Sequence, residues 1–151
     1  MTYLKNKNYS PVPYWCKLPY GMTFKNDATS VSVDSNDNVY VFCRGPIPVI
    51  IFNSEGEFIK SWGEGEFFRP HGIAHDNKDN VYLIDDQGHM VEKRDKDGKL
   101  IFRLGDKGKS SPRQSGDIFN LPTDAVIDPD NGDIYISVSY THLTLPTKVS
   151  V

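Results

Sequence analysis

The sequence predicts an all-β protein that forms part of a β-propeller, and three observations support this fold class. Short apolar strands alternate with polar turns, and no segment shows a sustained helical period. The pattern of strands and turns also returns after 42 residues. The matching pairs are Asp34 and Asp76, Val39 and Val81, and Trp62 and Leu104. A repeat of about 40 residues with four strands is typical of a propeller blade.

Strands can be placed in order along three repeat units, which we expect to be blades. The first blade covers residues 28–63 and the second covers residues 68–105, each with four strands. The third covers residues 119–137 and stops after two strands. The Gly- and Ser-rich stretch 106–117 is expected to be a surface loop. Polar turn residues stand between the strands at 35–38, 53–56, 77–80, 95–98 and 129–132.

Residues 1–27 form a proline-rich lead-in without a domain boundary. Its prolines, at positions 11, 13 and 19, favour an extended chain, and we expect an aromatic side chain from Tyr14-Trp15 to pack against the first blade. Cys16 and Cys43 lack the spacing of a zinc site. They are interpreted as two thiols, and a bridge between them is the alternative.

The chain holds about two and a half blades, whereas propellers close with about 4 to 8. We therefore expect an open arc with unpaired edge strands, and six blades in the complete ring. Residues 138–151 break the composition, since they contain no glycine and no acidic residue. The stretch 138–148 resembles a translated transposon-end adapter from a sequencing library. We expect residues 138–151 to be a non-native tail, and the native chain to continue after Ser137.

Composition argues against two classes of partner. The 17 Lys and Arg residues against 20 Asp and Glu give a net charge of −3, without a basic cluster for nucleic acid or an anionic membrane. The sequence has no apolar run long enough for a transmembrane helix, and its first residues are too polar for a signal peptide. As written, the chain is expected to be cytoplasmic.

His71 is the first candidate for a functional side chain. Pro70 fixes one backbone angle and Gly72 allows a close approach, so His71 is held at a tight entry into an apolar strand. Such a histidine is oriented, which suits either a metal ligand or a side chain that hydrogen-bonds to the backbone. His75 and His89 are interpreted as structural, with His89 orienting a turn.

The repeat units resemble NHL repeats over residues 28–137. The shared features are Val-Asp followed by Asn-Val-Tyr-Val, a second hairpin with Asp-x-x-Gly, and a closing Trp-Gly. Within that superfamily the order of motifs is similar to the peptidyl-α-hydroxyglycine α-amidating lyase family and its bacterial relatives. The motifs are Val31-Ser32-Val33-Asp34, Val41-Phe42-Cys43-Arg44-Gly45, Pro70-His71-Gly72-Ile73, Asp85-Asp86-Gln87-Gly88-His89 and Pro122-Thr123-Asp124.

This resemblance implies a zinc- and calcium-dependent lyase that cleaves an α-hydroxyglycine in the central cavity of the propeller. By motif, His71 would be one of three zinc ligands, and Ile73 and Val31 would offer main-chain carbonyls to calcium. Arg44 would be the catalytic arginine that faces the substrate. The family's catalytic tyrosine follows Ser-Asp-Gly, which this chain lacks, so Tyr140 is interpreted as accidental and His142 carries no weight. The other zinc histidines would belong to later blades, and the fragment alone is expected to be inactive.

Alternatives remain at each of these points. Arg44 suits an ordinary surface arginine at a strand end. The whole protein could be a non-catalytic platform that binds a peptide or protein partner, because fold does not fix function. A hydrolase or lactonase of similar architecture would need acidic metal ligands, which the sequence does not offer. Asp85 and Asp86 are adjacent in a strand and point to opposite faces, which argues against a shared acid-base site.

Overall fold

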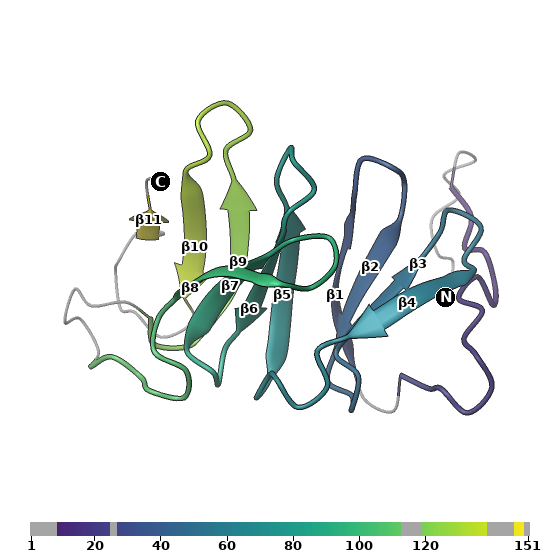
Figure 1. The fold of residues 1–151 in the computed structure, drawn as a ribbon, viewed down its shortest axis with the longest axis horizontal. Helices are drawn as coiled ribbons and strands as arrows, with labels where there is room; N and C mark the ends of the chain where they lie inside the picture. The colour runs from purple at the N-terminus through teal and green to yellow at the C-terminus, as the bar shows by residue number, and fades with distance from the viewer. Residues whose placement is uncertain (1–8, 25–26, 113–118, 139–146, 150–151) are drawn as a thin grey trace, which may run out of the picture.

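The computed structural model describes residues 9–24, 27–112, 119–138 and 147–149. These residues form three antiparallel sheets that follow one another along the chain and stand side by side in an arc (Figure 1). No helix occurs among the described residues, so the predicted all-β class is confirmed.

The first two sheets are four-stranded meanders, which we call blade 1 and blade 2. Each strand pairs with the next one along the chain, as short hairpin connections require. Blade 1 consists of β1 (Ala28–Val33), β2 (Val39–Cys43), β3 (Val49–Phe52) and β4 (Phe58–Trp62). Blade 2 consists of β5 (Pro70–His75), β6 (Val81–Asp85), β7 (Met90–Arg94) and β8 (Leu100–Leu104).

The third sheet, blade 3, contains β9 (Pro122–Ile127), β10 (Ile134–Val138) and β11 (Thr147–Val149). The sequence predicts two strands here, and the structure adds β11, which pairs with β10 along the edge away from β9. Unpaired N–H and C=O groups on an edge strand accept any extended segment within reach, which accounts for this difference. Part of the expected loop, residues 113–118, lies outside the described residues, as do Tyr140 and His142.

The 42-residue repeat reflects the same turn chemistry in blades 1 and 2. In the first hairpin the Asp34 carboxylate accepts hydrogen bonds from the main-chain N–H groups of Asn36 and Asn38, both at 2.9 Å. Asp76 accepts the corresponding bonds from Lys78 and Asn80 in the second hairpin. Each aspartate therefore caps its own turn, as expected for a hairpin turn.

Apolar side chains fill the two interfaces between blades. Between blades 1 and 2 they come from β2 and β3 on one side and from β5 and β6 on the other, and between blades 2 and 3 from β6, β7, β9 and β10. The largest fully buried residues at these interfaces are Phe42, Ile51, Leu83, Tyr82, Ile84, Ile134 and Ile136. Burial of this kind is the main force that holds successive blades together.

The lead-in packs against β2 and β3 on the face of blade 1 that points away from blade 2. The Trp15 ring lies 5.9 Å from that of Phe52 and its Nε1–H donates to the Ser54 carbonyl at 3.2 Å. The expected aromatic packing is therefore present. The main-chain N–H of Lys17 donates to the Gly56 carbonyl at 2.8 Å, which fastens the lead-in to the turn between β3 and β4.

Cys16 and Cys43 are both free thiols, and Cys43 is buried in the apolar layer beneath the lead-in. Among the described residues no helix has the length and apolarity needed to cross a membrane.

Candidate functional site

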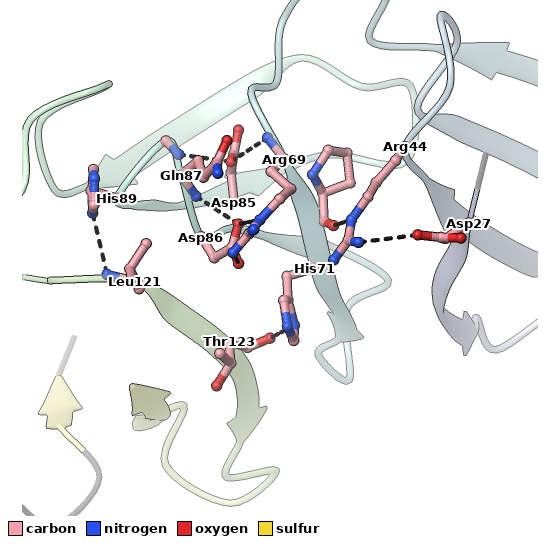
Figure 2. Close-up of polar contacts among 12 residues, drawn as sticks. Asp27, Arg44, Arg69, His71, Asp85, Asp86, Gln87, His89, Leu121 and Thr123 are labelled. Atoms are coloured by element: carbon pink, nitrogen blue, oxygen red, sulfur yellow. Dashed lines mark hydrogen bonds and ion pairs between the residues drawn. The ribbon is translucent and has the colours of Figure 1, made fainter. Parts of the chain in front are cut away.

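The first strands of the three blades, β1, β5 and β9, lie next to one another, with β5 in the middle. Polar side chains gather at the end of these strands where β5 and β9 begin and β2 and β6 finish (Figure 2). This cluster, which we call the strand-entry cluster, contains Arg44, Arg69, His71, Asp85, Asp86 and His89.

His71 at the start of β5 reaches across to blade 3. Its Nδ1 lies 2.7 Å from the main-chain carbonyl oxygen of Thr123 in β9. A carbonyl only accepts hydrogen bonds, so Nδ1 carries the proton and donates it. In the neutral imidazole Nε2 is then the nitrogen with a free lone pair, and no hydrogen bond joins it to a residue that the structure describes. A histidine that ligates a metal is oriented in this way by its other ring nitrogen.

Gly72 makes this contact possible. A Cβ atom on Gly72 would lie 2.6 Å from the Thr123 carbonyl oxygen and 2.8 Å from the Asp124 carboxylate, both closer than side chains normally approach. The absence of a side chain at Gly72 therefore lets β5 and β9 come together, and the sequence interpretation of a close approach is correct at this position.

Arg44, at the end of β2, lies beside the residue that precedes His71. Its Nε donates to the Pro70 carbonyl at 3.2 Å, and its Nη1 pairs with Asp27 at 3.1 Å. A third of its side chain remains exposed. The structure therefore brings together two of the residues predicted from the sequence, Arg44 and His71, on adjacent blades (Figure 2).

Val31 and Ile73 occupy equivalent positions in β1 and β5. Val31 pairs with Val41 as Ile73 pairs with Leu83, so the main chain has the same orientation at both. The N–H of Ile73 does not bond within its own sheet, since it donates to Ser30 Oγ on blade 1 at 3.3 Å. In an antiparallel ladder the N–H and C=O of one residue lie on the same side, so the Ile73 carbonyl also lies on the free edge of its sheet.

Asp85 and Asp86 have a role that sequence reasoning missed. Asp85 is fully buried and accepts hydrogen bonds from the main-chain N–H groups of Phe68 at 2.5 Å and Arg69 at 2.8 Å. Asp86 binds the Arg69 guanidinium through both oxygens, with Nε donating at 2.7 Å. The two carboxylates thus hold the chain immediately before His71. A sequence signal existed, because Gly88 three residues after Asp85 leaves room for a buried carboxylate.

The other histidines in the described residues have structural contacts, as predicted. Nδ1 of His89 accepts a hydrogen bond from the main-chain N–H of Leu121 at 3.2 Å, and His89 has a φ of 52° in the turn before β7. His75 lies between blades, with its ring 4.5 Å from that of Tyr40 and its Nδ1 2.8 Å from Ser32 Oγ. Burial lowers the pKa of His75, and the nearby carboxylates of Asp34, Asp79 and Asp76 oppose that shift.

In the described ranges no three His, Cys, Asp or Glu side chains come together as a possible metal site. His71 is thus a single imidazole that is oriented by one main-chain carbonyl, that of Thr123. Any complete zinc site would need ligands from elsewhere.

Curated proteins similar in sequence point to one enzyme family. Peptidyl-alpha-hydroxyglycine alpha-amidating lyase 1 of Drosophila melanogaster is 36% identical over 104 residues, which cover 64% of this chain and 18% of that protein. A probable lyase of the same name from Caenorhabditis elegans is 32% identical over 93 residues, covering 61% of this chain and 26% of that protein. The chain resembles the amidating lyases.

The similarity to amidating lyases is partial in length. The mouse peptidyl-glycine alpha-amidating monooxygenase is 27% identical over 141 residues, and the match spans 74% of this chain but 14% of that protein. The matches therefore span between about a seventh and a quarter of the length of these three relatives. No protein-family model matches the sequence.

Solved structures similar to this chain confirm the propeller-like fold. A Kuenenia stuttgartiensis hydrazine synthase chain superposes with a TM-score of 0.63 at 10% identity, over 82% of this chain and 32% of that chain. A streptogramin B lyase superposes with a TM-score of 0.53 at 13% identity, over 80% and 39% of the two chains. At these identities the likeness concerns the fold alone, and the resemblance to the amidating lyases depends on the sequence matches.

Proposed function

We propose that this chain supplies the first blades of a metal-dependent lyase that cleaves the C–N bond of a C-terminal α-hydroxyglycine. The observation that carries the proposal is the hydrogen bond from His71 Nδ1 to the Thr123 carbonyl. It leaves Nε2 as the available ligand nitrogen at the motif position that the amidating-lyase resemblance assigns to zinc. Two relatives named as such lyases, at 32% and 36% identity, support the choice of reaction class.

Each candidate residue has a role that suits its position. His71 would bind zinc through Nε2. The carbonyls of Ile73 and Val31, on equivalent free edges, would bind calcium, which prefers oxygen ligands. Zinc, when bound, would polarise the substrate hydroxyl or favour its deprotonation. Arg44 would bind the substrate carboxylate, because a guanidinium recognises a carboxylate through two parallel hydrogen bonds.

The reaction has a simple balance. The hydroxyl of the α-hydroxyglycine loses its proton and becomes the aldehyde of glyoxylate as the C–N bond breaks. The amide nitrogen that leaves takes up a proton, which gives the C-terminal amide. Nothing is oxidised or reduced, so the chain needs no redox partner for this step.

The chain by itself lacks part of the machinery that this proposal requires. In the described residues no three His, Cys, Asp or Glu side chains come together, whereas catalytic zinc sites have three protein ligands. We therefore expect the remaining ligands to come from further blades of the gene product, and the isolated chain to be inactive. A cytosolic location also remains a prediction.

The test is release of glyoxylate from a peptide ending in α-hydroxyglycine, measured on the complete gene product. His71→Ala is expected to abolish release and to lower zinc content, and Arg44→Ala to raise the KM for the substrate. His75→Gln is the matched control, since His75 lies on the same strand but packs between blades. A metal-free gene product, or a His71→Ala variant with normal activity, would contradict the proposal.

A second candidate function is a non-catalytic platform for a peptide or protein. The lead-in exposes Tyr14 and Tyr20 almost completely, and Tyr20 lines a cavity of about 320 Å³ with Pro19, Met22 and Ile47. Exposed aromatic side chains beside an apolar cavity are typical of peptide-binding surfaces. Peptide binding that is lost in Tyr20→Ser and retained in His71→Ala would favour this alternative.

A further inference from the structure

Residues 85–89, from the last residue of β6 to the residue before β7, contact the chain before His71 and the strand that binds its ring, and we call them the 85–89 loop. On the first side its carboxylates hold the residues that lead into His71. Asp85 binds the main-chain N–H groups of Phe68 and Arg69, and Asp86 binds the Arg69 side chain. The Asp86 N–H also donates to the Arg69 carbonyl at 3.3 Å. The main chain is therefore fixed up to two residues before His71 (Figure 2).

On the second side the 85–89 loop holds the strand that binds the His71 ring. His89 Nδ1 accepts the N–H of Leu121, which stands two residues before Thr123. Pro122, between them, restricts the backbone, so a constraint on Leu121 is transmitted to Thr123. The Thr123 carbonyl is the group that receives the His71 Nδ1 proton.

The 85–89 loop is itself rigid. Gly88 N–H donates to Asp85 Oδ1 at 2.8 Å, and a Cβ on Gly88 would lie 2.6 Å from the Asp85 carboxyl carbon. Gly108 N–H donates to the Gly88 carbonyl at 2.9 Å, and Gly105 packs so closely that a Cβ there would lie 2.3 Å from the His89 carbonyl oxygen. A segment held this tightly can fix the positions of the residues that it contacts.

Blade 1 does not repeat this arrangement. At the 42-residue spacing, Asp85 and Asp86 correspond to Cys43 and Arg44. Blade 1 thus forms the same four-stranded sheet without the two carboxylates. The carboxylate pair is not a general requirement of the blade, which favours a local purpose at β5.

We propose that the 85–89 loop is a positioning device that holds His71 in the Nδ1–H tautomer, with Nε2 available to a ligand. The inference rests on the proposed function in one respect, the use of Nε2 for a metal. Asp85, Asp86 and His89 act through His71 and are positioning residues. The device works because a misplaced carbonyl at Thr123 or a shifted backbone at Arg69 would release the imidazole to its ordinary preference for a proton on Nε2.

The test is the tautomer of His71 in the metal-free 151-residue chain, read from the imidazole nitrogen shifts in a ¹⁵N-histidine NMR spectrum. The variants are Asp85→Asn, Asp86→Asn and His89→Gln. The matched control is Glu92→Gln, because Glu92 is a fully buried carboxylate of the same blade whose partners, Arg94 and Arg103, lie away from β5. Circular dichroism and the tryptophan side-chain signals report whether each variant is folded.

The proposal predicts Nδ1–H as the major form of His71 in the wild type and in Glu92→Gln, and loss of that form in the loop variants. If Asp85→Asn does not fold, the test depends on Asp86→Asn and His89→Gln. Folded Asp86→Asn and His89→Gln chains with the wild-type His71 signal would overturn the proposal.

A second readout separates this inference from the proposed function. In the complete gene product, removal of such supporting contacts is expected to lower zinc affinity by about 10- to 100-fold. Tautomer changes in the loop variants, together with a wild-type His71 signal that Zn²⁺ leaves unchanged, would support the positioning role and contradict the zinc role.

Discussion

His71 on blade 2 donates its Nδ1 proton to the main-chain carbonyl of Thr123 on blade 3, over 2.7 Å. The two residues are 52 positions apart, so the orientation of the imidazole depends on how two blades pack. The packing of blades 2 and 3 therefore determines where the nitrogen atom that we propose as a metal ligand points.

Gly72→Ala is expected to destabilise the chain by about 1 to 3 kcal/mol, because the new methyl group would overlap the Thr123 carbonyl. Separation of β5 from β9 to relieve this overlap would also weaken the hydrogen bond from His71 to Thr123. Urea unfolding measures the cost. Gly45→Ala is the control, since a Cβ there would meet only Cys43 Sγ at an ordinary 3.7 Å. Equal costs for the two variants would contradict the close approach of β5 and β9.

Stability is expected to fall as the pH drops below about 6.5, through protonation of His75. Burial lowers the pKa of His75 in the folded chain below its usual 6.5, so the unfolded chain binds more protons between those two values. The contribution of His75 to the free energy of unfolding is therefore complete above its pKa in the unfolded chain. It is lost as the pH falls through its pKa in the folded chain.

Unfolding curves between pH 7.5 and 5.5 measure this dependence, and His75→Gln is expected to flatten it. The groups that face His75 are Ser32 and Tyr40 on blade 1 and the carboxylates of Asp34, Asp76 and Asp79. Identical pH profiles for the wild type and His75→Gln would show that another group titrates.

Tyr82→Ala is expected to cost about 3 kcal/mol or more, and Tyr135→Ala much less. The two tyrosines stand at equivalent places in β6 and β10, but blade 3 covers Tyr82 to 1% exposure, whereas Tyr135 is only partly covered. Thermal unfolding of both variants compares them directly. A cost for Tyr135→Ala as large as that for Tyr82→Ala would mean that the outer face of blade 3 is already packed.

The isolated chain is expected to associate with itself, because both ends of the arc expose apolar side chains. Val31 and Val33 on blade 1 and Val126 on blade 3 are each more than half exposed. Sedimentation at increasing concentration measures association, and Val126→Ser is expected to reduce it. A wild-type chain that stays monomeric and unfolds sharply would contradict this expectation.

The sequence predicts local features well because their causes are local. The hairpin at Asp34 forms through hydrogen bonds that reach only four residues along the chain, and the same bonds recur at Asp76. The order of strands in blades 1 and 2 follows from short turns, and the packing of Trp15 on blade 1 follows from its place in a proline-rich lead-in.

The sequence does not predict contacts that depend on how separate segments meet. From the sequence, Asp85 and Asp86 could only be judged unsuited to a shared acid-base site. Their role becomes clear in the fold, where the end of β6 lies beside Phe68 and Arg69. The pairing of β11 with β10 likewise depends on an available strand edge, which no local pattern encodes. The partner of His71 is a main-chain carbonyl. Every residue has one, so the sequence does not indicate which carbonyl binds the imidazole.

The central claim is that His71 is oriented as a metal ligand through Nε2. The most direct measurement is a Zn²⁺ titration of the metal-free gene product, in which the imidazole nitrogen signals of His71 are recorded by NMR at each step. The account predicts a shift of the Nε2 signal while Nδ1 keeps its proton, with His75 unaffected. A His71 spectrum that does not change with Zn²⁺ would contradict the account.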